Sequence, residues 1–269
     1  MKAEPMLIVA ERINSSRKSV ARAMETRNAV FIQNEASTQA EAGADYIDVN
    51  AGAFPGEELE CLRWVVEVVQ KAVDLPLSID SPDPEVIKRV LPLVNKPPLI
   101  NSITLEPTRL NGILPLAADH GARVIALCQS EERMAESIDD KVRLAGRLVE
   151  SVIRMGISLD NLYIDPLVYP LATHPQSAMV ATGAVERIMR EFPGVHTICG
   201  LTNVSYGLPE RRLINRTFLV AAISRGLDAA ILDPTDKLLF SALKAGLAVV
   251  GRDDYCMDFI AAFRAGRLG

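Results

Sequence analysis

Short apolar runs recur along the chain, and each is followed by a stretch with helical periodicity. In residues 75–81, for example, Leu75, Leu77 and Ile79 are apolar and the run ends on Asp80. Apolar runs of this length, bounded by turn residues, are typical of buried strands. We therefore expect strands over residues of about 6–13, 45–49, 75–81, 98–103, 123–128, 162–167, 196–203 and 228–232.

Amphipathic segments separate these predicted strands. Residues 58–73 show the pattern, with Leu62, Val65, Val66 and Val69 at helical spacing. On the same grounds we expect helices over residues of about 29–42, 58–73, 84–94, 108–120, 139–155, 214–225, 236–245 and 258–264, and one more that ends near residue 192.

Strands that alternate with helices predict an α/β fold with a parallel sheet. The runs are apolar throughout, as expected when both faces of a sheet are buried. No linker or change of composition divides the 269 residues. We predict a single (β/α)8 TIM barrel in one domain, residues 1–269, because this is a usual length for that fold. A doubly wound open sheet is the alternative, and the absence of GxGxxG or GxxxxGKS after the first strand weakens it.

The composition of the chain limits the classes of partner that we expect it to bind. The chain is 49% hydrophobic and has a formal net charge of −5 without a block of like charge. A general nucleic-acid surface needs a basic face, so we expect no nucleic-acid partner. No apolar run is long enough to span a bilayer, and the N-terminus lacks a signal-peptide pattern. We expect a cytoplasmic protein that does not bind membranes.

The four cysteines and three histidines are scattered. No CxxC occurs among Cys61, Cys128, Cys199 and Cys256. This spacing argues against a structural zinc site or an iron–sulfur cluster, and dispersed thiols suit a reducing compartment. We expect no metal ligands.

Polar residues follow most of the predicted strands. In a barrel of this type the active site lies at the carboxyl ends of the strands. No histidine or lysine stands there, so Schiff-base chemistry and a histidine-rich metal site lack their usual residues. Carboxylates and amides would suit a neutral heterocycle rich in N–H donors. The candidate residues are Glu11, Asp48, Asn50, Asp80, Asn101, Asp165, Thr202, Asn203 and Asp233.

Other interpretations of these residues stay open. Converging carboxylates could hold Mg²⁺, although the asparagines dilute the charge. Individual residues could only cap helices or close turns, and Asp233 before Pro234 fits that role. Arg211 and Arg212 could be a solvated surface feature or could meet an anionic tail of the ligand.

Seven motifs follow one another in order: Glu11-Arg12-Ile13-Asn14, Asp48-Val49-Asn50, Asp80-Ser81, Ile100-Asn101-Ser102, Tyr163-Ile164-Asp165-Pro166-Leu167, Gly200-Leu201-Thr202-Asn203-Val204-Ser205 and Leu213-Ile214-Asn215-Arg216-Thr217-Phe218. Together they resemble the pterin-binding, corrinoid-dependent methyltransferases, and most closely the methyltetrahydrofolate:corrinoid/iron–sulfur protein methyltransferases. The folate domain of methionine synthase and dihydropteroate synthase are more distant. The similarity extends from about residue 6 to about residue 263.

The resemblance implies a dihydropteroate synthase-like barrel that binds the pterin of tetrahydrofolate, in a homodimer without zinc. Asp80, Asn101 and Asp165 match positions that hydrogen-bond the pterin ring. Asn203 matches an asparagine on a mobile loop that approaches N5 of the pterin, so Asn203 and Asp165 are the expected catalytic residues. Further pocket positions are matched by Glu11, Asp48, Thr202 and Arg211.

The implied reaction moves a methyl group between N5 of tetrahydrofolate and the cobalt of a corrinoid (cobalamin), in either direction. Proton or hydrogen-bond donation to N5 would come from Asn203, Asp165 and water. Asp119-His120-Gly121 does not have the DxHxxG spacing of a corrinoid site. The corrinoid is therefore expected on a separate partner protein. The alternatives are a dihydropteroate synthase-like enzyme, which the lack of a strand-end lysine weakens, and a non-catalytic pterin- or folate-binding module.

Overall fold

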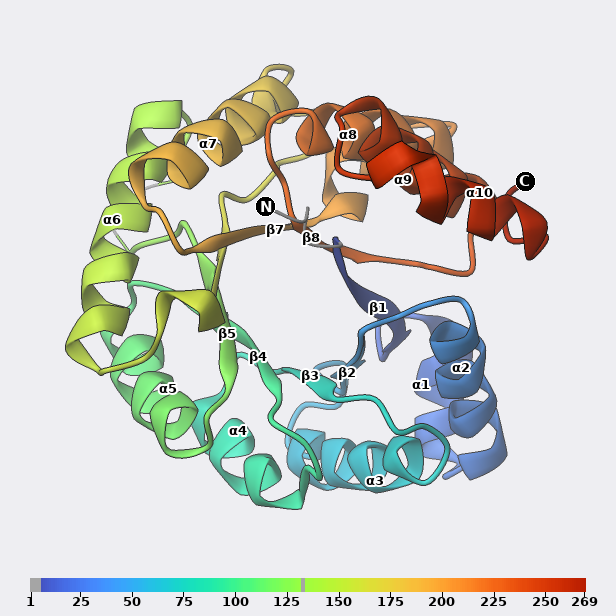
Figure 1. The fold of residues 1–269 in the computed structure, drawn as a ribbon. Coiled ribbons are helices and arrows are strands. Elements are labelled where there is room, and N and C mark those ends of the chain that lie inside the picture. The colour runs from blue at the N-terminus through green and yellow to red at the C-terminus, as the bar shows by residue number, and fades with distance from the viewer. Residues whose placement is uncertain (1–5, 132–133) are drawn as a thin grey trace.

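The computed structural model describes residues 6–131 and 134–269, so the first five residues of the predicted domain lie outside it. Over the described residues, eight parallel strands pair in sequence order and close into a barrel surrounded by helices (Figure 1). This confirms the predicted (β/α)8 architecture. The strands are β1 (Leu7–Asn14), β2 (Tyr46–Asn50), β3 (Leu77–Asp80), β4 (Leu99–Ile103), β5 (Arg123–Leu127), β6 (Leu162–Asp165), β7 (His196–Gly200) and β8 (Ala229–Leu232).

The helices agree with the predicted pattern except for one short addition. They are α1 (Lys18–Glu25), α2 (Ala29–Glu41), α3 (Glu58–Gln70), α4 (Pro84–Val90), α5 (Pro107–Asp119), α6 (Ile138–Arg154), α7 (Ser177–Glu191), α8 (Arg211–Ile223), α9 (Lys237–Val249) and α10 (Met257–Arg264). The additional helix is α1. Only Val20, Ala23 and Met24 of its residues are buried, which is too few to show a period in the sequence.

Several predicted elements end earlier than expected, and three of them are informative about the backbone. Strand β6 stops at Asp165, since Pro166 has no N–H for the ladder. Helix α4 gives way to the 3₁₀ turn η1 (Leu91–Leu93), which contains Pro92. Strand β7 ends at Gly200, and the next residues form the 3₁₀ helix η3 (Leu201–Ser205). Thr202 and Asn203 therefore lie on a 3₁₀ turn and not on a strand, which corrects the predicted strand 196–203.

An apolar layer fills the barrel below the strand ends. Tyr46, Leu99 and Tyr163 belong to this buried cluster, which also contains Val9, Ile125, Ile198 and Ala229. Side chains alternate along a strand, so the residue two positions further points to the same side. Asp48, Asn101 and Asp165 thus stand directly above Tyr46, Leu99 and Tyr163. The barrel has a packed floor and a polar upper layer.

Two larger apolar clusters pack the outer face of the barrel against the helices. No helix among the described residues is both long enough and apolar enough to cross a membrane.

Candidate active site

A cavity of about 690 Å³ opens at the carboxyl end of the barrel. It brings together seven of the eight predicted site residues, namely Glu11, Asp48, Asp80, Asn101, Thr202, Asn203 and Arg211. The eighth, Asp165, is not part of its lining. The sequence analysis missed several further lining residues, among them Asn14, Ser16, Arg17, Tyr206 and Asn215. Asn14 is the last residue of β1, and the others lie in loops and on α8, where only spatial closeness to the barrel marks them.

Carboxylates and amides of β2, β3 and β4 form the inner wall of this cavity. The parallel register sets Asn50 beside Asp80 and Asp80 beside Asn101. The Asn50 amide donates to Asp80 Oδ2 at 3.0 Å. The Asn101 amide donates to Asp48 Oδ1 at 3.3 Å, and the Ser78 hydroxyl donates to the same oxygen at 2.6 Å. Each carboxylate thus has one oxygen that accepts from the protein and one that accepts no hydrogen bond from any described residue.

Burial makes these carboxylates reluctant to ionise. It raises the pKa of Asp80 to about 6, partly offset by the hydrogen bond from Asn50. Asp48 is 2% exposed, and burial followed by the charge of Asp80 holds its pKa well above the ordinary range. The wall therefore consists of poorly solvated acceptors, which N–H donors of a bound ring would stabilise. Amide donors already occupy one oxygen of each group, which favours a hydrogen-bonding wall over a Mg²⁺ site.

Asp165, at the end of β6, is not among the residues that line the cavity. It is 5% exposed, and its Oδ1 accepts from the Leu167 backbone N–H at 2.7 Å. Burial raises the pKa of Asp165 to about 6, while hydrogen bonds from the backbone of Leu167 and Gly200 lower it. Lys141 fixes this turn, because its ammonium group donates to the carbonyls of Pro166 and Leu167 at 2.7 and 3.0 Å.

The 3₁₀ turn η3 carries Thr202 and Asn203 over the cavity. Arg211, the first residue of α8, donates from Nη2 to the Thr202 carbonyl at 2.8 Å and from Nε to Ser205 Oγ at 3.1 Å. Arg211 therefore holds the turn, and α8 begins three residues earlier than predicted. The Asn203 side chain is exposed and makes no hydrogen bond within the described part of the chain. Its amide is free to meet a ligand.

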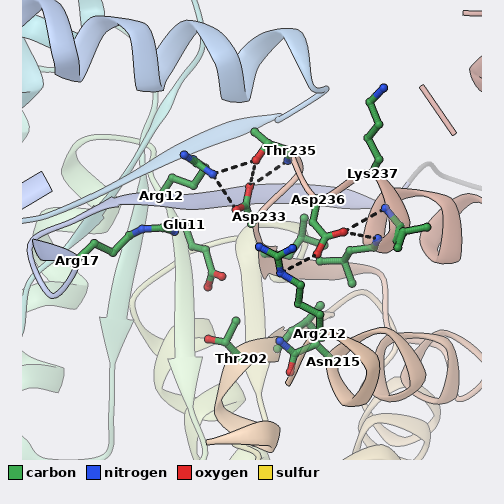
Figure 2. A pocket seen from close by; sticks show the side chains of 14 residues that line it. Glu11, Arg12, Arg17, Thr202, Arg212, Asn215, Asp233, Thr235, Asp236 and Lys237 are labelled. Carbon is green, nitrogen blue, oxygen red and sulfur yellow. Dashed lines mark hydrogen bonds and ion pairs between the residues drawn. The ribbon is translucent and has the colours of Figure 1, made fainter. Parts of the chain in front are cut away.

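A second cavity, of about 470 Å³, adjoins the first on the β8 side (Figure 2). Arg12 spans its upper wall and donates to both carboxylate oxygens of Glu35, at 2.7 and 3.1 Å. It also donates to Asp233 Oδ2 and Thr235 Oγ1, each at 3.1 Å. Asp233 Oδ1 in turn accepts from the Thr235 backbone N–H at 3.0 Å. Asp233 thus closes a turn, and it is not the N-cap that its place before Pro234 suggested, because Asp236 caps α9.

Glu11 forms part of both cavities and points between Arg17 and Thr202 in Figure 2. Burial, followed by the charge of Asp233, raises the pKa of Glu11 to about 7, while the charges of Arg17 and Arg211 lower it. Its carboxyl group makes no hydrogen bond within residues 6–131 and 134–269. Glu11 is therefore a group that exchanges a proton near neutral pH.

Known proteins resemble this chain over most of its length. A methylcorrinoid:tetrahydrofolate methyltransferase of Eubacterium limosum is 38% identical over 266 residues, and the match covers 98% of both chains. A methionine synthase of Mycobacterium tuberculosis is 27% identical over 84% of this chain, which corresponds to 20% of that protein. The dihydropteroate synthase of Xanthomonas albilineans superposes with a TM-score of 0.70 at 21% identity, covering 93% of this chain and 95% of that one. At this identity the structural likeness shows the shared barrel alone.

The sequence profile of one family, described as pterin binding enzymes, matches residues 10–233. These residues include every motif on which the predicted resemblance rests, from Glu11 to Phe218. The profile covers well over half of the chain, and the relative from Eubacterium limosum matches nearly all of it. This chain therefore belongs to the family of pterin binding enzymes.

Proposed function

We propose that the protein transfers a methyl group between the cobalt of a corrinoid, carried on a separate protein, and N5 of tetrahydrofolate. The observation that carries the proposal is the wall of poorly solvated polar groups, Asp48, Asp80 and Asn101, in the same cavity as an exposed amide, Asn203. The name of the Eubacterium limosum relative supports the same pair of substrates. Its wording also favours the direction from methylcorrinoid to tetrahydrofolate.

The wall fits the pterin ring chemically. A reduced pterin presents ring N–H and amino donors beside a carbonyl and a ring nitrogen. Asp80 would accept hydrogen bonds from the ring N–H and amino groups. The Asn101 side chain, which has both donor and acceptor atoms, would bond to the edge of the ring where donors and acceptors lie side by side. Asp165 would act from behind Gly200, through the backbone or a bridging water, since it does not line the cavity.

Methyl transfer requires that the reacting atoms are held close together and that one proton is released from N5. When N5 of tetrahydrofolate takes the methyl group, the electron pair of the cobalt–carbon bond stays on cobalt and the N5 proton passes to solvent water. The Asn203 oxygen can accept from N5–H, and its NH₂ can donate to N5 in the reverse reaction. Because the corrinoid supplies the nucleophile or the methyl donor, the chain mainly orients N5 and polarises it.

A corrinoid protein needs access to the open face of the barrel, where the side chains of Asn203 and Tyr206 are exposed. We propose that a corrinoid protein docks over this mouth and that the whole chain, residues 1–269, acts as one domain. All four cysteines are free thiols, which supports a cytoplasmic location.

A homodimer is proposed through the outer faces of α7 and α8. These helices border an apolar cavity of about 480 Å³ that includes Met179 and Leu213, which are 76% and 57% exposed. A second copy would cover them. Light scattering after size exclusion tests this proposal: Met179→Lys should shift the protein towards monomer, and a monomeric parent protein would contradict it.

The reaction is tested by mixing the protein anaerobically with methylcob(III)alamin and tetrahydrofolate and recording the corrinoid spectrum. We expect conversion to cob(I)alamin with formation of methyltetrahydrofolate, and the reverse with methyltetrahydrofolate and cob(I)alamin. Pterin binding without transfer, even with a protein-bound corrinoid, would indicate a binding module. Absence of pterin binding would overturn the proposal.

The dihydropteroate synthase alternative fits the cavity less well. Arginines supply the cations of its described lining, namely Arg17, Arg211 and Arg212, and no lysine is among them. Condensation of a dihydropterin pyrophosphate with 4-aminobenzoate by the purified protein would favour that alternative.

A further inference from the structure

Lys141 on α6 is a fully buried lysine close to the end of β6. It is 1% exposed, and its ammonium group donates to the carbonyl oxygens of Pro166 and Leu167 at 2.7 and 3.0 Å. The same group lies 4.7 Å from the centre of the Tyr169 ring. A lysine is seldom fully buried without partners, because desolvating an ammonium group is costly. Lys141 therefore holds the segment that follows β6 by three contacts.

These contacts stabilise a backbone turn that is unfavourable by itself. Leu167 has a φ of +59°, in the left-handed region, which a non-glycine residue adopts at a conformational cost. The Leu167 N–H donates to Asp165 Oδ1 at 2.7 Å, while the Leu167 carbonyl accepts from Lys141. Asp165 and Lys141 thus hold the strained residue from both of its polar groups.

The segment after β6 is bonded to η3 on both sides of Asn203. Asp165 accepts a hydrogen bond from the backbone of Gly200, the last residue of β7. The Leu171 N–H donates to the Val204 carbonyl at 3.0 Å. Gly200 precedes Asn203 and Val204 follows it, so the segment held by Lys141 sets the position of the turn from which Asn203 reaches the cavity.

Charge also connects Lys141 to Asp165. Burial raises the pKa of Asp165 to about 6, while backbone hydrogen bonds and the charge of Lys141 lower it. Three further titratable groups face Asp165, namely Cys128 after β5, Cys199 on β7 and Tyr169. Burial raises the pKa of all three above the ordinary range, so they are uncharged at neutral pH. Lys141 is the cation that acts on the Asp165 carboxylate.

We propose that Lys141 is a positioning residue for methyl transfer, which sets the place of Asn203 through the turn after β6 and favours the ionised carboxylate of Asp165. The inference deepens the proposed function and rests on it. Lys141 does not line the cavity that contains Asn203, and it borders a separate cavity of about 390 Å³ beside the start of α7. It therefore acts on the reaction through other residues.

The pKa of Asp165 in the ligand-free protein tests the effect of the Lys141 charge independently of activity. Carbon-13 NMR of the side-chain carboxyl group follows the titration in the parent protein and in Lys141→Met, which removes the charge at similar side-chain length. We expect the pKa of Asp165 to rise by about one pH unit in the variant, because the nearby cation is lost. An unchanged pKa would overturn the proposal.

Transfer kinetics test the positioning of Asn203. Lys141→Met should lower kcat about tenfold at pH 8, while the dissociation constant of tetrahydrofolate changes less than about threefold, because Asn203 moves and the cavity wall does not. The acidic limb of the kcat profile should move up by about one pH unit, together with the pKa of Asp165. A lysine that only stabilises the fold would leave kcat and this limb unchanged in the folded variant, and that result would overturn the proposal.

Lys244→Met is the matched control. The Lys244 side chain on α9 is 20% exposed and its ammonium group lies 5.6 Å from the centre of the Phe240 ring, yet Lys244 lines none of these cavities. This change should leave kcat, the acidic limb and the pKa of Asp165 as in the parent protein. Equal effects of Lys244→Met and Lys141→Met would overturn the proposal.

Folding of each variant is checked by circular dichroism. If Lys141→Met does not fold, Lys141→Gln takes its place, because glutamine keeps a donor and removes the charge, and the same rise in the pKa of Asp165 and the same shift of the acidic limb are expected. A parent protein that transfers no methyl group would refute the proposed function. Unchanged variants of an active parent protein would refute the role of Lys141 alone.

Discussion

At the scale of single residues, the side chains of this protein divide into groups that are held and groups that are free. Asp48 and Asp165 are buried and Asp80 is half-buried, and each of these carboxylates accepts at least one hydrogen bond from the protein. Asn203 is exposed and its amide makes none within the described residues. Held groups define a rigid binding surface, whereas a free amide can follow a reacting atom.

Asn203→Ala should therefore affect transfer more than binding. We expect kcat to fall about 100-fold, because the hydrogen bond to N5 is lost, while the dissociation constant of tetrahydrofolate changes less than about threefold. Stopped-flow spectra of the corrinoid measure the rate, and calorimetry measures binding. Asn161→Ala, in the 3₁₀ turn η2 (Leu159–Asn161) before β6, is the matched control. An unchanged rate would remove the proposed role of Asn203.

His196 offers a test of stability at the opposite end of the barrel. Its Nδ1 lies 2.6 Å from Asp228 Oδ2 and its Nε2 lies 3.3 Å from Asp160 Oδ1, while the ring stacks on Tyr163. The hydrogen bond to Asp228 raises the pKa of His196, and desolvation opposes this effect. The folded state thus favours the protonated ring.

The stabilisation by His196 is complete below the unfolded pKa of about 6.5 and is lost as the pH rises through the folded pKa. We expect His196→Gln to cost about 1–2 kcal/mol in the free energy of unfolding near pH 6, and less near pH 9. Urea unfolding at both pH values measures the difference. A cost that is the same at both pH values would contradict a charged His196.

At the scale of elements, one cluster ties the first and last strands of the barrel together. Arg12 on β1 binds Glu35 on α2 and Asp233 just after β8, and its backbone N–H donates to the buried Gln39 side chain at 2.8 Å. β1 and β8 are also paired directly, from Leu7 opposite Ala229 to Ala10 opposite Leu232. The cluster thus stabilises the seam at which the barrel closes.

Arg12→Gln should destabilise the protein by about 2–3 kcal/mol, because it leaves the partly buried carboxylates of Glu35 and Asp233 without their cation. Arg63→Gln is the matched control. Arg63 pairs with Glu60 one helical turn away at 3.6 Å on an exposed surface, so this change should cost less than about 0.5 kcal/mol. Equal costs in urea unfolding would show that the Arg12 cluster does not stabilise the seam.

At the scale of the whole molecule, the poorly solvated carboxylates of the site lower the folding stability of the ligand-free protein. Burial raises the pKa of both Asp80 and Asp165 to about 6, so ionising them costs more in the folded than in the unfolded chain. Folding stability from these two groups is present at low pH and is lost as the pH rises from about 4 through about 6. A pterin that donates to the ionised carboxylates would reverse this loss.

The affinity for tetrahydrofolate should therefore increase from about pH 5 to about pH 7, by about tenfold for each group that must ionise. Over the same range the rise in melting temperature on adding tetrahydrofolate should grow. Calorimetry and thermal unfolding under anaerobic conditions measure the two effects. Asp80→Asn should flatten the part of both profiles due to Asp80, and a pH-independent affinity of the parent protein would contradict the proposed role of these acceptors.

Local sequence patterns predicted most of the elements of this molecule. Buried strands and the helices after them show in apolar runs and in helical spacing, which depend on near neighbours only. Helix α1 was not predicted because it buries too few residues to show a helical period. The end of β7 was predicted too late because the end of the strand and the following 3₁₀ turn share one apolar run, Ile198 to Leu201. The family could be inferred because its motifs stand at strand ends in a fixed order.

The sequence by itself determined eight strands that alternate with helices, most of them followed by polar residues, because strand length, helix length and alternation are local properties. Tertiary structure alone decided which polar groups share a cavity. It left Asp165 out of the cavity lining, and it joined Arg12 to Asp233 across 221 residues. It also created the second cavity, whose lining includes Arg12, Arg17 and Arg212. Burial and contact depend on the closure of the whole barrel, so the raised pKa values and the second cavity exist only in the folded chain.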